Sequence, residues 1–257
     1  MALVFLEQFI ASYAKPPKVI VLDVDDTEDR VHGQQEQARY DGYDGGYCFM
    51  PLHLYEGLSG RLITTILKAK RFTGAQMLAV LKRLVKHLRQ AWPETLLIFR
   101  GDSHFASPEG MPWIEEQPEL NYVTGLTSNA VWKELAQDVV EQAQRASARF
   151  ERTVTRFHST RDQAGTWSRS RRVVIKVEVS DQGVNTRFVV TDMERARTQV
   201  LSQHLYGARG QAENEIKDHK LSLQSDRTAC HRFEANQFRL LLHAAAYVLL
   251  ETLRREV

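Results

Sequence analysis

The sequence predicts a mixed α/β protein with one main core and a β-rich insertion. The chain has 257 residues, of which 43% are hydrophobic and 26% charged, and this composition supplies one sizeable core. Short β-branched apolar runs alternate with longer segments of helical periodicity, and a block of strand-like segments precedes two final helices. These observations exclude disordered, collagen-like and disulfide-stapled chains.

Residues 1–150 are predicted to form the first part of the core. The opening residues have the pattern of an amphipathic helix, and the run KVIVLDVD at 18–25 is typical of a buried strand. Two further strands, on either side of a turn at 56–60, are predicted to follow this strand and form a β-meander. The other expected elements are strands at 48–55, 61–67, 95–99 and 121–125, a helix at 73–90 capped by Thr73, a helix that opens at 107–109, and a helix at 130–149.

Residues 151–192 are predicted to form the β-rich insertion, and residues 193–257 to complete the core with helices. The insertion is expected to contain strands at 152–158, 172–179 and 186–191, and the last part helices at 204–220 and 233–254. Trp167 lies among arginines of the insertion. The sequence leaves open whether this side chain packs in the core or stacks on an unpaired nucleic-acid base.

We expect a cytoplasmic protein that does not enter a membrane. The most apolar stretch, residues 240–250, is about half the roughly 20 residues that a membrane-spanning helix needs, and it contains His243. The opening segment has no basic start and carries Glu7, so it is a poor signal peptide. The only cysteines, Cys48 and Cys230, are far apart in the sequence, which fits a reducing compartment.

The two signs of charge occupy different parts of the chain, although the net charge is only +2. No acidic residue occurs between Gly57 and Pro93, and a second basic block spans residues 145–176. Acidic residues gather between Asp23 and Asp44. This separation suits a protein with a carboxylate metal site and a polyanionic partner, but solvated helix faces give the same pattern. The cations of the first block are Arg61, Lys68, Lys70, Arg71, Lys82, Arg83, Lys86 and Arg89.

Three acidic residues are candidates for a metal site. Asp25 and Asp102 each follow an apolar strand-like run, and Glu213 lies on a late predicted helix. Carboxylate oxygens are the ligands that Mg²⁺ and Mn²⁺ prefer. Two such ions about 3.5 to 4 Å apart activate water or a 3′-hydroxyl for phosphodiester transfer. A strand-end Asp is as often a turn or helix cap as a ligand.

The residues around Glu213 form a more specific pattern. Tyr206, Arg209, Glu213 and Lys220 follow one another at helical spacing, with Lys217 one turn after the Glu. On one helical stripe, the carboxylate faces the metals while the cations bind phosphates. The alternative is an ordinary stripe of ion pairs four residues apart.

In these motifs the sequence resembles the DDE transposases of bacterial insertion sequences, in the branch with the Tyr-Arg-Glu-Lys signature. Asp25 with Thr27 is similar to the family's first acid, RGDS at 100–103 to the second, and the residues around Glu213 to the signature. The resemblance implies a ribonuclease-H-like mixed sheet flanked by helices, with the insertion before the helix of the third acid. It also implies that Asp25, Asp102 and Glu213 hold two Mg²⁺ ions, for which Mn²⁺ substitutes. The residues implied to contact DNA are Tyr206, Arg209, Lys217 and Lys220.

The activity implied by the resemblance is metal-dependent nicking of DNA at transposon ends and strand transfer into target DNA. The implied partners are these DNAs and a second copy of the chain, in a homodimer associated with the nucleoid. Family members carry more chain before the first acid, so the resemblance implies a chain truncated at its N-terminus. A catalytically silent remnant that binds DNA is therefore an alternative to an active core.

A phosphatase is the second alternative. VIVLDVDDT at residues 19–27 fits the first motif of haloacid-dehalogenase-like phosphatases, with Asp23 as nucleophile and Asp25 as acid and base. A later acidic motif of that family is missing from residues 101–107. This reading requires Asp23 and gives Glu213 no role.

Overall fold

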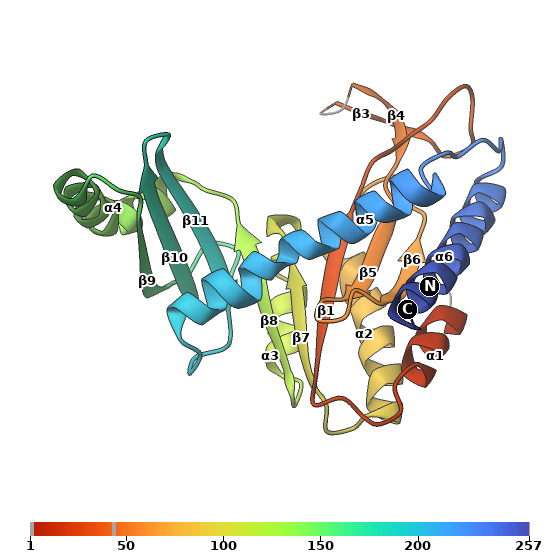
Figure 1. The fold of residues 1–257 in the computed structure, drawn as a ribbon, viewed down its shortest axis with the longest axis horizontal. Coiled ribbons are helices and arrows are strands. Elements are labelled where there is room, and N and C mark those ends of the chain that lie inside the picture. Colours follow the sequence, from red (N-terminus) through yellow and green to blue (C-terminus); the bar gives the residue numbers. More distant parts are fainter. Residues whose placement is uncertain (1–2, 43–44, 257) are drawn as a thin grey trace. The chain divides into compact units, whose positions relative to one another are not determined.

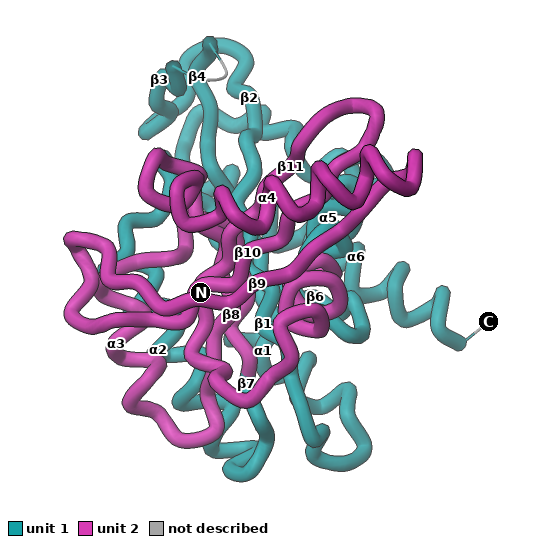
Figure 2. The backbone as a smooth tube through the Cα atoms, turned by 90° about the vertical axis from the view of Figure 1, so that its left-hand side faces the viewer, with its two compact units in different colours: residues 1–97, 209–257 teal, residues 98–208 magenta. Residues whose placement is uncertain are grey.

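The chain forms two compact units in a computed structural model that describes residues 3–42 and 45–256. Unit 1 consists of Met1–Leu97 and Arg209–Val257, and unit 2 of Ile98–Ala208. Figure 2 draws unit 1 in teal and unit 2 in magenta. The domain boundaries predicted at residues 150 and 192 were drawn from the order of elements along the chain, whereas the two units are defined by contacts between residues. The predicted boundaries stay a prediction.

Unit 1 contains an antiparallel meander of three strands, β1 (Val19–Asp26), β5 (Leu52–Glu56) and β6 (Leu62–Ile66), in the order β6-β5-β1. The register places Asp25 opposite His53 and Asp23 opposite Tyr55. Ile20 to Val24 are buried without alternation, as expected of a strand covered on both faces. The predicted meander is therefore confirmed.

A second, small sheet in unit 1 was not predicted. It contains β2 (Asp29–Arg30), β3 (Arg39–Asp41) and β4 (Gly46–Phe49), in the order β2-β4-β3. The predicted single strand at 48–55 is wrong, because the chain leaves β4 after Phe49 and begins β5 at Leu52. Pro51 lies in the gap, and proline has no amide hydrogen to donate to a strand ladder. Of the acidic cluster, Asp44 lies outside the described residues.

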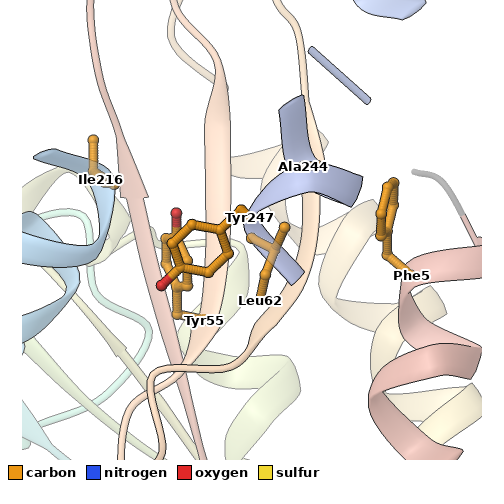
Figure 3. Close-up of a cluster of buried hydrophobic side chains, with 6 residues drawn as sticks. All are labelled: Phe5, Tyr55, Leu62, Ile216, Ala244 and Tyr247. Carbon is orange, nitrogen blue, oxygen red and sulfur yellow. The ribbon is translucent and has the colours of Figure 1, made fainter. Parts of the chain in front are cut away.

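Four helices complete unit 1: α1 (Leu3–Ala11), α2 (Gly74–Ala91), α5 (Gly210–Leu223) and α6 (Phe233–Glu256). Thr73 caps α2 as predicted, in a capping box with Gln76. Helices α1 and α6 both pack on β6 (Figure 1). A buried cluster joins α1, α5 and α6 to the meander; its members are Phe5, Tyr55, Leu62, Ile216, Ala244 and Tyr247 (Figure 3).

Unit 2 contains most of β7 (Leu96–Gly101), with β8 (Leu120–Leu126), β9 (Val154–Asp162), β10 (Arg171–Ser180) and β11 (Gly183–Thr191), in the order β7-β8-β11-β10-β9. Its α-helices are α3 (Gly110–Glu115) and α4 (Ala130–Phe150), and α4 packs on β9 and β10. The chain then passes through a π-helix, η2 (Val200–Tyr206), and a 3₁₀ turn, η3 (Gly207–Arg209), into α5. All three strands predicted for residues 151–192 are present.

The predicted mixed α/β class is confirmed, because helices flank the strands in both units. Three antiparallel strands are followed by helix, strand, helix and strand, which is the element order of a ribonuclease-H-like core, and the β-rich segment precedes α5. No helix in the described part of the chain is long and apolar enough to cross a membrane.

The buried cluster predicts how α5 is held in unit 1. Replacing Ile216, which is 5% exposed, with Ala leaves a cavity under α5 and should lower the free energy of unfolding by about 2 to 5 kcal/mol. Leu221→Ala on the same helix is the matched control; Leu221 is 79% exposed, so its loss should stay within about 0.5 kcal/mol. Urea unfolding followed by circular dichroism measures both, and equal losses would contradict the packing described.

Candidate active site

The first candidate acid, Asp25, lies at the carboxyl end of β1, where the strand leaves the core. Its side chain is 14% exposed, whereas Asp23, two residues earlier, is 1% exposed as a whole residue. Asp26 forms an ion pair with Arg71 at 3.3 Å between Oδ1 and Nη1. The Asp25 carboxylate lies next to Arg209, the residue directly before α5.

The third candidate acid, Glu213, lies in the first turn of α5. A carboxylate is favourable there because the helix dipole places partial positive charge at this end. Ala212 and Ile216, on the apolar side of α5, are buried, and the Glu213 side chain is 45% exposed. The helix thus anchors one face in the core and presents Glu213 beside β1.

Arg209 connects the two acids. Its Nη1 lies 3.3 Å from Oδ2 of Asp25, and its Nη2 donates to Oε1 of Glu213 at 2.6 Å. The ion pair four residues apart that the sequence allowed is therefore present, but the same guanidinium also reaches β1. A single cationic group thus spans carboxylates that are 188 residues apart in the sequence. These hard oxygen donors, already held around one cation, suit a divalent metal ion.

Lys220 binds the segment that follows Asp25. Its Nζ donates to Oγ1 of Thr27 at 2.9 Å and to the carbonyl of Glu28, and lies 3.2 Å from Oδ1 of Asp29. Burial raises the pKa of Asp29 to about 7, and the Lys220 ammonium opposes this shift. Lys217 is exposed.

The second candidate acid, Asp102, lies in unit 2, directly after β7. Its Oδ1 accepts from the amide of His104 at 2.8 Å, so it caps the short 3₁₀ helix Ser103–Phe105. The capping role that the sequence allowed is thus present. The neighbouring Arg100 is 1% exposed and donates to the carbonyl of Leu205 at 2.5 Å, which ties the end of β7 to the π-helix.

Tyr206 lies next to Gly125 of β8, close to the turn that follows Asp102. A Cβ added to Gly125 of β8 would collide with the Tyr206 hydroxyl and lie 3.2 Å from the amide nitrogen of Ser103. Glycine at 125 therefore leaves room for the tyrosine next to the Asp102 turn. A glycine inside a strand indicates close approach of another group, so Gly125 was the sequence signal for this contact.

The predicted site residues fall into two groups. Unit 1 brings Asp25, Glu213 and Arg209 together and joins Lys220 to Thr27 and Asp29. Unit 2 contains Asp102, and it places Tyr206 next to Gly125, which also lies close to the amide of Ser103. Within residues 3–42 and 45–256, no three His, Cys, Asp or Glu side chains gather closely enough to hold one metal ion. The joint site of three acids stays a prediction.

Trp167 is a core residue of unit 2. It is 7% exposed, with its ring 5.9 Å from that of Trp132 and the Arg171 guanidinium 5.5 Å from its centroid. The interpretation of Trp167 as a platform for an unpaired base is not supported, because a buried ring presents no free face.

Comparison with known proteins identifies a family. The model described as "Transposase DDE domain group 1" matches residues 1–257. Among solved structures, the chain is similar to a piggyBac transposase synaptic complex with hairpin DNA, determined by cryo-electron microscopy, at 13% identity and a TM-score of 0.47. The match covers 91% of this chain and 46% of that one. No curated protein sequence matches.

The raised pKa of Asp29 predicts a pH-dependent stability. Between its ordinary value of 3.8 and about 7, folded Asp29 keeps a proton that the unfolded chain has lost. Its contribution to stability is therefore present at low pH and declines as the pH rises to about 7, by at most about 1.4 kcal/mol per pH unit. Asp29→Asn removes the titrating group, so wild type should lose stability relative to this variant from pH 5 to pH 7.

Urea unfolding at pH 5, 6 and 7 measures the difference in the free energy of unfolding between wild type and Asp29→Asn. The other titrating groups are the same in both proteins, so their contributions cancel in this difference. Asp181→Asn, at an exposed turn, serves as the control and should keep a constant offset from wild type. A constant offset for Asp29→Asn as well would show that Asp29 does not titrate in this range.

Proposed function

The chain belongs to the transposase DDE domain group 1 family, and we propose that it nicks DNA at the ends of an insertion sequence and transfers the freed 3′-hydroxyl into target DNA. The observation that supports this most directly is the bridge from Arg209 to Asp25 and Glu213. It brings two carboxylates of the expected set to one cation, on the strand and helix where the motifs predict them.

Members of this family generally use divalent metal ions. We propose that Asp25, Asp102 and Glu213 would hold two Mg²⁺ ions, with Mn²⁺ able to substitute. The ions supply activation of water or of a 3′-hydroxyl and stabilisation of the leaving oxygen. The oxygen donors around the Arg209 guanidinium support this assignment, because the guanidinium occupies a place suited to positive charge.

The cationic side chains have separate roles in this proposal. When metal ions take over the two carboxylates, Arg209 would bind a phosphate, which a guanidinium grips with two parallel hydrogen bonds. Lys220 holds Thr27 and Asp29 and so keeps Asp25 in position, in addition to the phosphate contact that its motif predicts. Tyr206 and the exposed Lys217 are the remaining predicted DNA contacts.

The phosphatase alternative has less support. It needs Asp23 as an accessible nucleophile, but Asp23 is 1% exposed within the buried part of β1. It also leaves the bridge at Glu213 without a function. We retain Asp25 as the first acid. The alternative of a catalytically silent remnant remains, and a cleavage assay distinguishes it from an active enzyme. We also propose that the chain acts as a homodimer associated with the nucleoid in the cytoplasm.

Substitution of the acids tests the activity. Asp25→Asn, Asp102→Asn and Glu213→Gln should each lower nicking of supercoiled plasmid in Mn²⁺ by at least about 100-fold, because loss of a ligand exceeds the 10- to 100-fold effects of outer-shell changes. The exposed Asp181→Asn is the control and should cleave like wild type. Nicking that survives all three substitutions would refute the proposed site, and a wild type that shifts DNA in gels but never nicks it would indicate a remnant.

Removal of Arg209 tests whether the guanidinium stands where a metal ion binds. Arg209→Gln leaves two carboxylates near each other, so the metal-free variant should lose about 1 to 2 kcal/mol of stability. Its melting temperature should then rise more on addition of Mn²⁺ than that of wild type. Arg145→Gln, which breaks an exposed pair with Glu141 four residues away, should change neither value. If Mn²⁺ raises the melting temperature of all three proteins equally, the Arg209 guanidinium does not occupy the position of the metal ion.

A further inference from the structure

Arg100, near the carboxyl end of β7, is buried although it is charged. The residue is 1% exposed and has the largest fully buried side chain in the described part of the sequence. An arginine keeps its proton in a folded protein. Burial of a charge costs free energy unless hydrogen bonds replace the lost water. The surroundings of Arg100 therefore have to supply acceptors, and those acceptors indicate what the side chain does.

The acceptors are main-chain carbonyls at the joint between the π-helix η2 and the 3₁₀ turn η3. Nη1 of Arg100 donates to the carbonyl of Leu205 at 2.5 Å, and Nη2 donates to the carbonyl of Ala208 at 3.4 Å. Carbonyls in the last turn of a helical segment lack a partner within it and carry partial negative charge. The guanidinium thus satisfies two such groups at once, and they stabilise its charge.

These two carbonyls lie on either side of Tyr206 in the chain. Leu205 directly precedes Tyr206, and Ala208 follows it by two residues. The hydrogen-bond spacing changes from five residues in η2 to three in η3 and four in α5. The direction of each side chain depends on where these changes occur. Contacts that fix the joint between η2 and η3 therefore also fix the direction of Tyr206.

The same arginine lies two residues before the second candidate acid. A Cβ added to Gly101 would lie 2.9 Å from the ring of Phe105, so this ring packs directly on the strand end. The Asp102 carboxylate caps the turn that contains Phe105. The Tyr206 hydroxyl lies close to this turn. Arg100 thus joins the main chain around Tyr206 to the strand end that carries Asp102.

A second buried arginine of unit 2 uses the same chemistry at another place. Arg172, on β10, is 8% exposed, and its Nη1 donates to the carbonyls of Met193, Glu194 and Ala196. It holds the segment that leads from β11 to η2, and this segment contains none of the candidate site residues. The two arginines differ in what they hold, so Arg172 is a matched control for Arg100.

We propose that Arg100 is a positioning residue for the cleavage reaction: it fixes the joint between η2 and η3 and so holds Tyr206 in place near the turn that follows Asp102. This inference rests on the proposed function, because Tyr206 is a predicted DNA contact of that reaction. Displacement of a substrate-positioning group by about 1 Å costs about 100-fold in rate. Arg100 acts on the rate of nicking through Tyr206 and needs no contact of its own with DNA.

A double-mutant cycle on the nicking of supercoiled plasmid in Mn²⁺ tests this role. Arg100→Met has a long side chain without a donor and should lower the nicking rate at saturating plasmid by about 10- to 100-fold. In a Tyr206→Phe background it should lower the rate by less than about threefold, because the hydroxyl that it positions is absent. Arg100→Lys, which keeps a donor, should recover part of the rate. Arg172→Met should nick like wild type at a temperature where all variants are folded.

Hydrogen exchange followed by mass spectrometry gives a second measurement that does not require cleavage. The amides of η2 and η3 should exchange at least about tenfold faster in Arg100→Met than in wild type, because the joint opens more often without its two hydrogen bonds. Arg172→Met should instead speed exchange at residues 193–198, whose carbonyls Arg172 holds.

Two results would overturn the proposal. One is an equal loss of nicking rate from Arg100→Met in the wild-type and Tyr206→Phe backgrounds, which indicates a general loss of structure. The other is unchanged exchange of η2 and η3 in Arg100→Met. If wild type cleaves no plasmid, the proposed function fails. Faster exchange would then still support the positioning of Tyr206 by Arg100, and unchanged exchange would overturn it.

Discussion

Two cations at the start and end of α5 hold the helix against the carboxyl end of β1, and the arrangement of the unit 1 acids depends on them. Arg209 reaches Asp25 and Glu213, and Lys220 reaches Thr27 and Asp29. These cations are 11 residues apart, so the contact extends about 16 Å along the helix. Removing Arg209 leaves the mostly buried Asp25 carboxylate without this cation, which costs more than the loss of an exposed ion pair.

The apolar side of α5 sets its rotation, and the polar side sets its position along β1. Ala212, Ile216 and His219 are buried at spacings of four and three residues, which fixes the face that meets Tyr55 and Tyr247. Glu213 follows Ala212 and is therefore turned about 100° away from the core. Burial of this face of α5 is therefore enough to turn Glu213 toward the end of β1.

Most elements were predictable because their signals are local. The apolar run of β1, the cap at Thr73 and the periodicity of α5 each lie within a few residues, and the structure has all three. The α-helix predicted from residue 204 begins only at Gly210, because a π-helix and a 3₁₀ turn precede it. The small sheet around β4 was missed because strands of two to four residues show no periodicity. The link from Lys220 to Asp29 and the packing of Trp167 on Trp132 join residues distant in sequence, and spacing alone does not reveal such contacts.

The candidate acids were found through motif order, which identifies residues but not their contacts. The contacts of Arg209 with Asp25 and Glu213 form only in the folded chain. They place two of the candidate metal ligands beside one another. We propose that Asp25, Asp102 and Glu213 share metal ions. Anomalous diffraction from crystals soaked in Mn²⁺ tests this proposal: ions should lie within about 2.2 Å of oxygens from all three side chains. Ions bound elsewhere, or at Asp25 and Glu213 without Asp102, would contradict it.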